Sequence, residues 1–198
     1  MLQKFGTVVS YRRPLCPGDY EISVLVFSDA NRQDSNGQLG FICGLLVGPF
    51  SVGSLFHTIS WSSKKSKRPV RSIGSAETIA AGVAIDEGKL LVMSLKLLLG
   101  IHVDLRVCVD SKDLWDTLTT CHEPTDKSVR ADVNVIRYEF ETHKVNFMSW
   151  IPGKLNMSDP LTKKDSPMNK SLQLMMFSGE LPVSYEDAKT RKSEQSTG

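Results

Sequence analysis

Cysteine and long apolar runs are scarce in this sequence, and each scarcity excludes a class of protein. The four cysteines lie far apart, so neither a zinc site built on a Cys-x-x-Cys pair nor a dense disulfide framework is indicated. The longest apolar stretch, LLVMSLKLLLGI, is short and is interrupted by Lys96, which argues against a membrane-spanning helix. The first residues also lack the apolar segment of a secretory signal. We therefore expect a soluble intracellular protein with reduced cysteines.

Length and composition favour a single globular domain. The 198 residues are 40% hydrophobic and 23% charged, which is ordinary for a chain that buries a core. The net charge of +2 identifies no partner, so the positions of the cations matter more than their number. From Glu186 onward no aliphatic side chain is larger than that of Ala188, which predicts a mobile end. We divide the chain into an N-terminal extension (residues 1–20), a globular domain (21–182) and a disordered tail (183–198).

Three β-strands are predicted at the start of this domain. Residues 21–29, 38–47 and 54–61 are rich in β-branched and aromatic side chains and show no helical period. The polar turn NRQDSNG separates the first two segments, and the Gly/Pro/Ser-rich link GPFSVG separates the second from the third. Connections this short favour an antiparallel meander.

Helices and strands alternate after the meander. Apolar spacing and β-branched runs predict, in order, a helix at 75–99, a strand at 103–110, a helix after Asp110, a helix at 126–142, a strand at 145–151 and a helix that begins at Asp159. Glu77 shares a helical stripe with small residues (Ala81, Ala84, Gly88), which would let the helix approach a sheet closely, so its side chain should point toward that sheet. The order predicts an α/β fold in which helices cover the faces of a mixed sheet.

Acidic residues stand where these elements end or face inward. Asp29 and Asp110 each follow a predicted strand, and if the two strands are parallel neighbours the two carboxylates lie side by side. Like charges at that distance raise each other's pKa unless a cation lies between them. Glu77 and Asp159 could complete the cluster. Each acid alone also has an ordinary interpretation, as a turn or cap residue, a solvated helix residue, or a helix-start signal beside Pro160.

The chemistry of such a cluster is specific. Four carboxylates with no histidine or cysteine suit a hard cation such as Mg²⁺ or Mn²⁺ and argue against zinc. Two such ions can hold the attacking and leaving oxygens of a phosphodiester during its cleavage. The sequence therefore predicts a metal-dependent site for phosphodiester chemistry, without a protein nucleophile.

Five segments of the chain, in order, resemble a known family. SDAN, ISWSSKK, SAETIAA, VDSKDL and IPGKLNMSDPLTKKDSP are similar to the ribonuclease H domain that ends the Pol polyprotein of copia-type LTR retrotransposons. The resemblance covers roughly residues 20–182. It implies an RNase H-like fold, with a five-stranded mixed sheet whose first three strands are antiparallel and with helices on both faces. It also implies cleavage of the RNA strand of RNA/DNA hybrids, which leaves 3′-hydroxyl and 5′-phosphate ends.

The resemblance also implies the site residues and the cofactor. The family's metal-binding acids match Asp29, Glu77, Asp110 and Asp159, which would hold two Mg²⁺ ions, with Mn²⁺ as a substitute. Asp29 and Asp110 would anchor both ions, Glu77 one of them and Asp159 the other. No small-molecule cofactor and no membrane are implied. The sequence departs from the family where Asn156-Met157-Ser158-Asp159 replaces Asn-Pro-Ala-Asp, and where the loop before Asp159 lacks a histidine.

Basic residues precede the helix that carries Glu77. The segment WSSKKSKRPVR contains Lys64, Lys65, Lys67, Arg68 and Arg71. Cations beside the acidic site would bind phosphates in a salt-dependent manner, although a lysine-rich run is more often a solvated loop. Asn31 and Ser75 are candidates for contacts to 2′-hydroxyl groups. The three tryptophans, Trp61, Trp115 and Trp150, are expected in the core.

Two other functions are compatible with the same residues. One is a catalytically inactive or domesticated RNase H-like module that binds nucleic acid, because mobile-element genes decay readily. The other is an integrase or transposase core, which shares the fold but usually carries glutamate as its last acid. The expected partners are an RNA/DNA hybrid and a reverse transcriptase domain in cis or in trans. The expected location is a retrotransposon particle in the cytoplasm, with access to the nucleus.

Overall fold

A computed structural model describes residues 21–32, 36–120, 122–124, 126–182 and 184–193. The proposed N-terminal extension (residues 1–20) and the last residues of the proposed tail (194–198) lie outside the described residues, as does residue 183. In the described part of the chain, no helix combines the length and the apolarity that a bilayer span requires.

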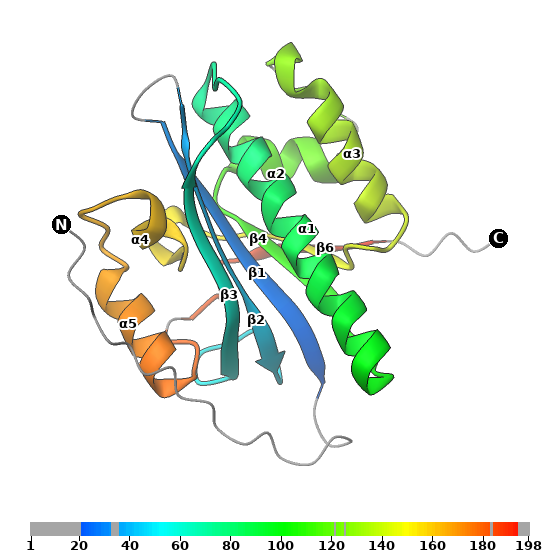
Figure 1. Cartoon of the computed structure of the whole chain (residues 1–198), viewed down its shortest axis with the longest axis vertical. Coiled ribbons are helices and arrows are strands. Elements are labelled where there is room, and N and C mark those ends of the chain that lie inside the picture. The colour runs from blue at the N-terminus through cyan, green and yellow to red at the C-terminus, as the bar shows by residue number, and fades with distance from the viewer. Residues whose placement is uncertain (1–20, 33–35, 121, 125, 183, 194–198) are drawn as a thin grey trace.

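The described chain is organised around one mixed β-sheet (Figure 1). The strand order is β3-β2-β1-β4-β5-β6, with the bounds β1 Ile22–Asn31, β2 Gln38–Val47, β3 Leu55–Lys65, β4 Asp104–Val109, β5 Phe147–Trp150 and β6 Lys189–Lys192. The first three strands are antiparallel, and β4 joins β1 in parallel, as does β5 with β4. The predicted mixed sheet with an antiparallel meander is confirmed.

The sixth strand, β6, was not predicted. We expected residues 183–198 to be disordered, but Lys189–Lys192 pairs antiparallel with β5. All four residues are exposed, so the strand has no apolar side that a pattern could reveal. Backbone hydrogen bonds hold it instead, together with Lys192, whose ammonium lies 5.7 Å from the centre of the Phe147 ring.

Helices cover both faces of this sheet (Figure 1). Three of them lie on one face, namely α1 Ile73–Leu99, α2 Lys112–Thr119 and α3 Arg130–Glu141, with the short 3₁₀ turn η1 Lys127–Val129 before α3. The other face carries α4 Asp159–Thr162 and α5 Asn169–Ser178, and the 3₁₀ turn η2 Gly153–Leu155 precedes α4. We predicted one helix from Asp159 to about Phe177, but the chain leaves helical geometry between Thr162 and Asn169, a segment that contains Pro167.

The long helix α1 has clear start and stop signals. Ser72 caps its first turn by accepting a hydrogen bond from the Ser75 backbone, and Gly100 ends it in the left-handed conformation with φ 67°. Its small residues allow close packing, because a Cβ on Gly88 would lie 2.6 Å from Leu105 Cδ1. The predicted approach of this helix to the sheet is confirmed, and it orients Glu77 toward the strands.

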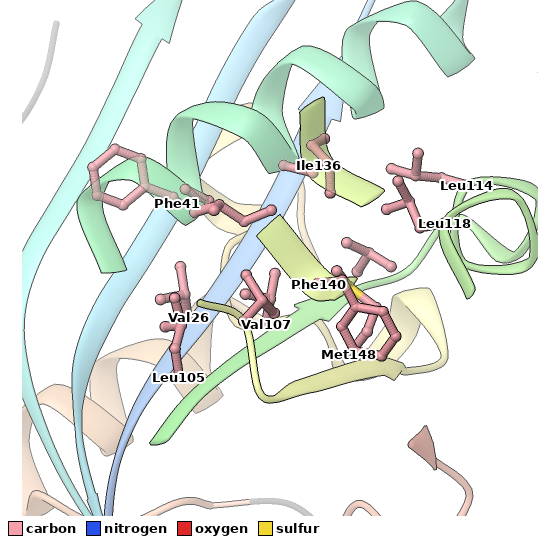
Figure 2. Packing of buried hydrophobic residues seen from close by; sticks show 14 of the residues in the cluster. Val26, Phe41, Leu105, Val107, Leu114, Leu118, Ile136, Phe140 and Met148 are labelled. Atoms are coloured by element: carbon pink, nitrogen blue, oxygen red, sulfur yellow. The ribbon is translucent and has the colours of Figure 1, made fainter. Parts of the chain in front are cut away.

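Two hydrophobic cores sandwich the sheet. Alternate residues of β1 serve different cores, Val26 on the α1 face and Phe27 on the α5 face. Figure 2 shows the first core, in which Val107 and Ile136 pack between the sheet and the helices. Because both faces of β1 are buried, its sequence reads as a continuous apolar run without a polar side. Burial on both faces makes β1 a rigid support for Asp29.

Candidate active site

Asp29 and Asp110 are neighbours at one edge of the sheet. Strands β1 and β4 run parallel, with Phe27 opposite Cys108 as their last paired residues. Two residues farther along each chain stand Asp29 and Asp110, at the same level on adjacent strands. The expectation that these carboxylates would lie side by side is therefore confirmed.

Glu77 reaches the same place from α1. Its side chain is buried, at 7% exposure, and accepts a hydrogen bond from the backbone of Ala30. Together with Asp29 and Asp110 it forms a group in which each residue offers one carboxylate oxygen within 4.8 Å of the other two. Three segments of the sequence, β1, α1 and the end of β4, thus bring three carboxyl groups to one point, where Asp29 and Glu77 are buried and Asp110 is partly exposed.

Burial makes this cluster costly. Removal from water, followed by repulsion from Asp110, raises the pKa of Asp29 to about 7, while the Thr162 hydroxyl and Lys163 oppose the rise. Burial, then repulsion from Asp110 and Asp29, raises the pKa of Glu77 well above its ordinary range. Burial also raises the pKa of Asp110, against a hydrogen bond from Asn156. Binding of protons or of a cation would therefore relieve the repulsion among these three carboxyl groups.

The unsatisfied oxygens of this cluster show what kind of cation would fit. Among the described residues, Asp29 Oδ1 and Glu77 Oε2 are buried and make no hydrogen bond. A buried carboxylate oxygen without a donor is costly, and a metal ion would satisfy it. The donors are all oxygens, which suits Mg²⁺ or Mn²⁺. These three acids therefore fit a hard divalent cation.

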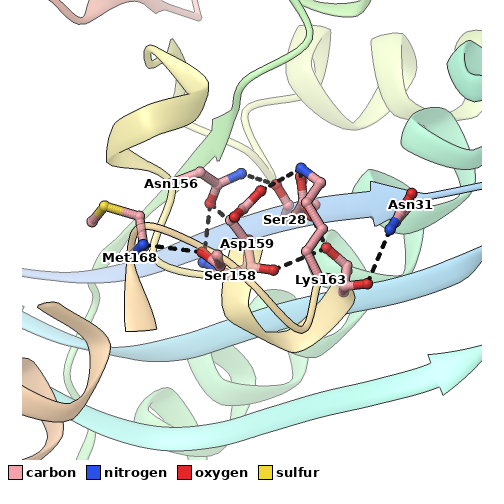
Figure 3. Close-up of polar contacts among 10 residues, drawn as sticks. Ser28, Asn31, Asn156, Ser158, Asp159, Lys163 and Met168 are labelled. Atoms are coloured by element: carbon pink, nitrogen blue, oxygen red, sulfur yellow. Dashed lines mark hydrogen bonds and ion pairs between the residues drawn. The ribbon is translucent and has the colours of Figure 1, made fainter. Parts of the chain in front are cut away.

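Asp159 lies beside this group rather than inside it. It is the first residue of α4 and is buried, at 4% exposure. Its carboxylate forms an ion pair with Lys163, which also lies 3.7 Å from Asp29 Oδ1 (Figure 3). The structure thus brings three of the four predicted acids together and separates the fourth from them by a lysine.

Polar contacts attach the short helix α4 to β1. Thr162 donates its hydroxyl to Asp29 Oδ2, and Asn31 Nδ2 donates to the Thr162 carbonyl at 3.2 Å. Asn156 Nδ2 donates to the Ser28 carbonyl at 2.8 Å, while its Oδ1 accepts from Ser158 (Figure 3).

We did not predict Asn156, Thr162 or Lys163 as site residues. For Thr162 and Lys163 the available signal was their spacing of three and four residues from Asp159, which places them one helical turn away, whereas Asn156 lies in extended backbone before α4 and carried no such signal.

A tryptophan also supports the acidic cluster. Trp150 Nε1 donates to the main-chain oxygen of Asp110 at 2.9 Å, so this residue positions a site acid and is only partly buried. Trp115 Nε1 makes the analogous bond to the Met148 carbonyl at 3.1 Å and packs against the core, as expected. The prediction that Trp61 is a core residue was wrong, because it is 52% exposed.

The predicted nucleic-acid residues differ in their surroundings. Lys64 and Lys65 end β3 and are exposed, and the strand register places Ser63 opposite Gly40, which in turn faces Asp29. Two strand spacings amount to about 10 Å, so the lysines flank the acids. Lys67, Arg68 and Arg71 are also exposed. Arg68 forms an ion pair with Asp132 at 3.1 Å.

Ser75 does not meet the expectation of a nucleic-acid contact. Its side chain is buried, at 3% exposure, and its hydroxyl donates to the Ser72 carbonyl while accepting from the Ser72 backbone. The residue belongs to the cap of α1. Asn31 remains partly exposed, although its amide nitrogen is already bonded to the Thr162 carbonyl.

A cavity of about 790 Å³ gives access to the acids between α1 and α2. Glu77 and Asp110 line it together with Ser111, Thr117 and other residues of both helices. The lining also contains the acids Asp113 and Asp126 and one cation, Lys127, so its charge is mainly negative and would repel phosphates. Phosphates are therefore better accommodated on the side of the acids where Lys64 and Lys65 stand.

No family model and no curated protein matches the sequence. Solved structures do match. LC11-RNase H1, isolated from compost by a metagenomic approach, is similar with a TM-score of 0.51 at 18% identity, over 76% of this chain and 98% of that chain. The same protein in complex with an RNA/DNA hybrid gives a TM-score of 0.51 at 16% identity, over 76% and 99% of the two chains.

A second solved protein agrees with the first. RNase H1 from the halophilic archaeon Halobacterium salinarum NRC-1 gives a TM-score of 0.50 at 13% identity, over 73% of this chain and 96% of that chain. At these identities the likeness concerns the fold. The chain has an RNase H-like α/β fold, and its described residues form a six-stranded sheet where we expected five strands.

Proposed function

We propose that this protein is a metal-dependent endonuclease that hydrolyses the RNA strand of RNA/DNA hybrids. One observation carries the proposal, namely the three carboxylates of Asp29, Glu77 and Asp110 within 4.8 Å of one another, of which the two that are buried, Asp29 and Glu77, have oxygens without a hydrogen bond. An RNase H-like fold supports it, since a solved neighbour, LC11-RNase H1, has been captured with an RNA/DNA hybrid. The resemblance to copia-type elements favours the same substrate.

In this proposal the acidic residues hold the cations and the basic residues hold the substrate. By the family resemblance, Asp29 and Asp110 would hold both Mg²⁺ ions, Glu77 one ion and Asp159 the other. The bound ions would lower the pKa of the attacking water and neutralise charge on the departing 3′-oxygen. Thr162 and Trp150 keep Asp29 and Asp110 in position through their hydrogen bonds.

Lys64 and Lys65 would hold the hybrid by its phosphates. They are exposed at the end of β3, and phosphate binding there would place the backbone across the sheet edge. Lys67 and Arg71 extend this basic surface. We also propose a reverse transcriptase domain, in cis or in trans, as the source of the hybrid.

A cleavage assay tests this function. The RNA strand of a hybrid is labelled and incubated with the protein in Mg²⁺ and in EDTA, beside duplex DNA and duplex RNA of the same sequence. We expect cutting of the hybrid alone, only with metal, and loss of cutting in Asp110→Asn. Hybrid binding without cutting would instead identify a non-catalytic nucleic-acid-binding module. Joining of DNA ends would identify an integrase-type core.

A further inference from the structure

The residue after α4 places a positive charge inside the candidate site. The helix has four residues, Asp159–Thr162, and Lys163 follows as its C-terminal cap. Four residues after Asp159, the chain has turned once, so the ammonium returns to the Asp159 carboxylate and forms an ion pair with it. The same ammonium lies 3.7 Å from Asp29 Oδ1.

This lysine is held at one end and open to solvent at the other. The side chains of its two partners are almost fully buried, with 1% exposure for Asp29 and 6% for Asp159, whereas that of Lys163 is 41% exposed. The aliphatic part of the Lys163 side chain is therefore partly in contact with solvent, while its ammonium group lies between the two buried carboxylates. A flexible lysine of this kind can withdraw its charge into water without unfolding α4.

The two carboxylates that Lys163 joins are the ones a second metal ion would need. The first ion would be held by Asp29, Glu77 and Asp110, a group that does not include Asp159. An ion held jointly by Asp29 and Asp159 would have to occupy the place of the ammonium. Two cations cannot share that place, because their repulsion in a buried site far exceeds that in water.

We propose that Lys163 is a tethered counter-ion for the second metal position, which must withdraw before Asp29 and Asp159 can hold a divalent ion together. The inference rests on the proposed function and refines it. The protein would take up its first ion readily and its second more weakly, and Asp159 would become a metal ligand only after Lys163 leaves.

Calorimetric titration with Mn²⁺ alone, without nucleic acid, tests this order. We expect two binding events in the full chain, the second weaker by about tenfold or more. Lys163→Met keeps the length and apolar stem but removes the charge, so the second affinity should rise by about tenfold, and by more than the first, whose ligand Asp29 the ammonium also faces. Asp159→Asn should abolish the second event only. Lys164→Met, which alters the adjacent exposed lysine, should change neither.

Each other outcome has a definite meaning. Equal affinity for two ions in the unmodified protein would overturn the inference without any variant. An unchanged or weaker second event in Lys163→Met, with native thermal unfolding, would show that the lysine only orders Asp159. Lys163→Arg, which retains the charge, should keep the weak second event even if the Met variant fails to fold. No Mn²⁺ uptake at all would overturn this inference and the proposed function together, whereas a first event with hybrid cleavage preserves the function.

Discussion

The indole nitrogen of Trp150 lies 2.9 Å from the main-chain oxygen of Asp110, to which it donates a hydrogen bond. The bond joins the last residue of β5 to the residue that follows β4, at the edge where the acids gather. A hydrogen bond to the main chain of Asp110 restrains its backbone, and with it the point from which its carboxyl group extends. Trp150 is therefore a positioning residue for the cluster.

Replacement of Trp150 by phenylalanine tests this role. Loss of the hydrogen bond should cost about 1 kcal/mol of unfolding free energy and lower Mn²⁺ affinity and hybrid cleavage by about tenfold. Trp115→Phe is the matched control, since it removes an equivalent bond to the Met148 carbonyl. The control should lose similar stability and keep its metal affinity. Equal losses of activity in both variants would contradict the positioning role.

Replacement of a cluster acid should separate catalysis from stability. Asp110→Asn should reduce hybrid cleavage by about 1,000-fold or more, because the variant loses a shared metal ligand. In EDTA the same variant should unfold at a higher temperature than the unmodified protein, since the repulsion on Asp29 and Glu77 is removed. Asp104→Asn, at the other end of β4, should change neither property. A destabilised Asp110→Asn variant in EDTA would argue against the repulsive cluster.

The metal-free protein should become less stable as pH rises. The pKa of Asp29 is raised to about 7, so between its ordinary pKa and that value the folded chain binds more protons than the unfolded chain. Stability is therefore lost as pH rises through this window, and Glu77 adds to the loss in the same direction. Thermal unfolding in EDTA measures this slope.

Added Mg²⁺ should oppose that loss. The ion binds the ionised carboxylates, so it should raise the unfolding temperature more at about pH 8 than at about pH 5.5. The pH dependence in EDTA should also be shallower in Asp110→Asn, which serves as the reference. A Mg²⁺ effect that is the same at both pH values would contradict the raised pKa of the cluster.

Close packing of Gly40 against α4 gives a further prediction. A Cβ at this position would lie 2.8 Å from Thr162 Cγ2 and 3.0 Å from Leu161 Cβ. Gly40→Ala should therefore displace α4, weaken the Thr162 bond to Asp29, lower cleavage by about tenfold and cost about 1–3 kcal/mol of stability. Gly82 lies within α1, and a Cβ there would have its nearest neighbour, Ile136 Cδ1, 4.0 Å away. Gly82→Ala should therefore stabilise the protein by about 0.5–1 kcal/mol. Full activity in Gly40→Ala would show that α4 tolerates the shift.

The basic end of β3 should govern substrate affinity. Lys64→Ala combined with Lys65→Ala should weaken hybrid binding and reduce the slope of log affinity against log salt by about 1–2. Lys96→Ala removes one positive charge near the far end of α1, about 28 Å along the helix from Glu77, and should leave that slope unchanged, whereas Lys64→Ala or Lys65→Ala alone should reduce it. Fluorescence anisotropy over a range of salt concentrations measures both. A similar effect of all three substitutions would indicate only a response to net charge.

The pattern of apolar and turn residues along the sequence was sufficient to predict most of the fold. The apolar runs of β1 and β4, the helical spacing of α1 and the turn residues between them determine which segments pair, because each must bury its apolar side. The same pattern placed Asp29 and Asp110 at one sheet edge and directed Glu77 toward it. It could not reveal β6, whose four residues are exposed and which pairs with β5 through backbone hydrogen bonds.

Contacts of a few ångströms depended on packing. The positions of α4 against Gly40 and of Lys163 between Asp29 and Asp159 follow from how two distant segments fit together. Packing also brings Trp150 to the main-chain oxygen of Asp110. It likewise places Ser75 in the cap of α1, where its hydroxyl donates to the Ser72 carbonyl. Periodicity reports which side of an element is buried, but it carries no information on which polar atoms meet across elements. Hydrogen bonds and ion pairs have effect only over such short distances, so three-dimensional packing alone decided which acids share the site and which one pairs with a lysine.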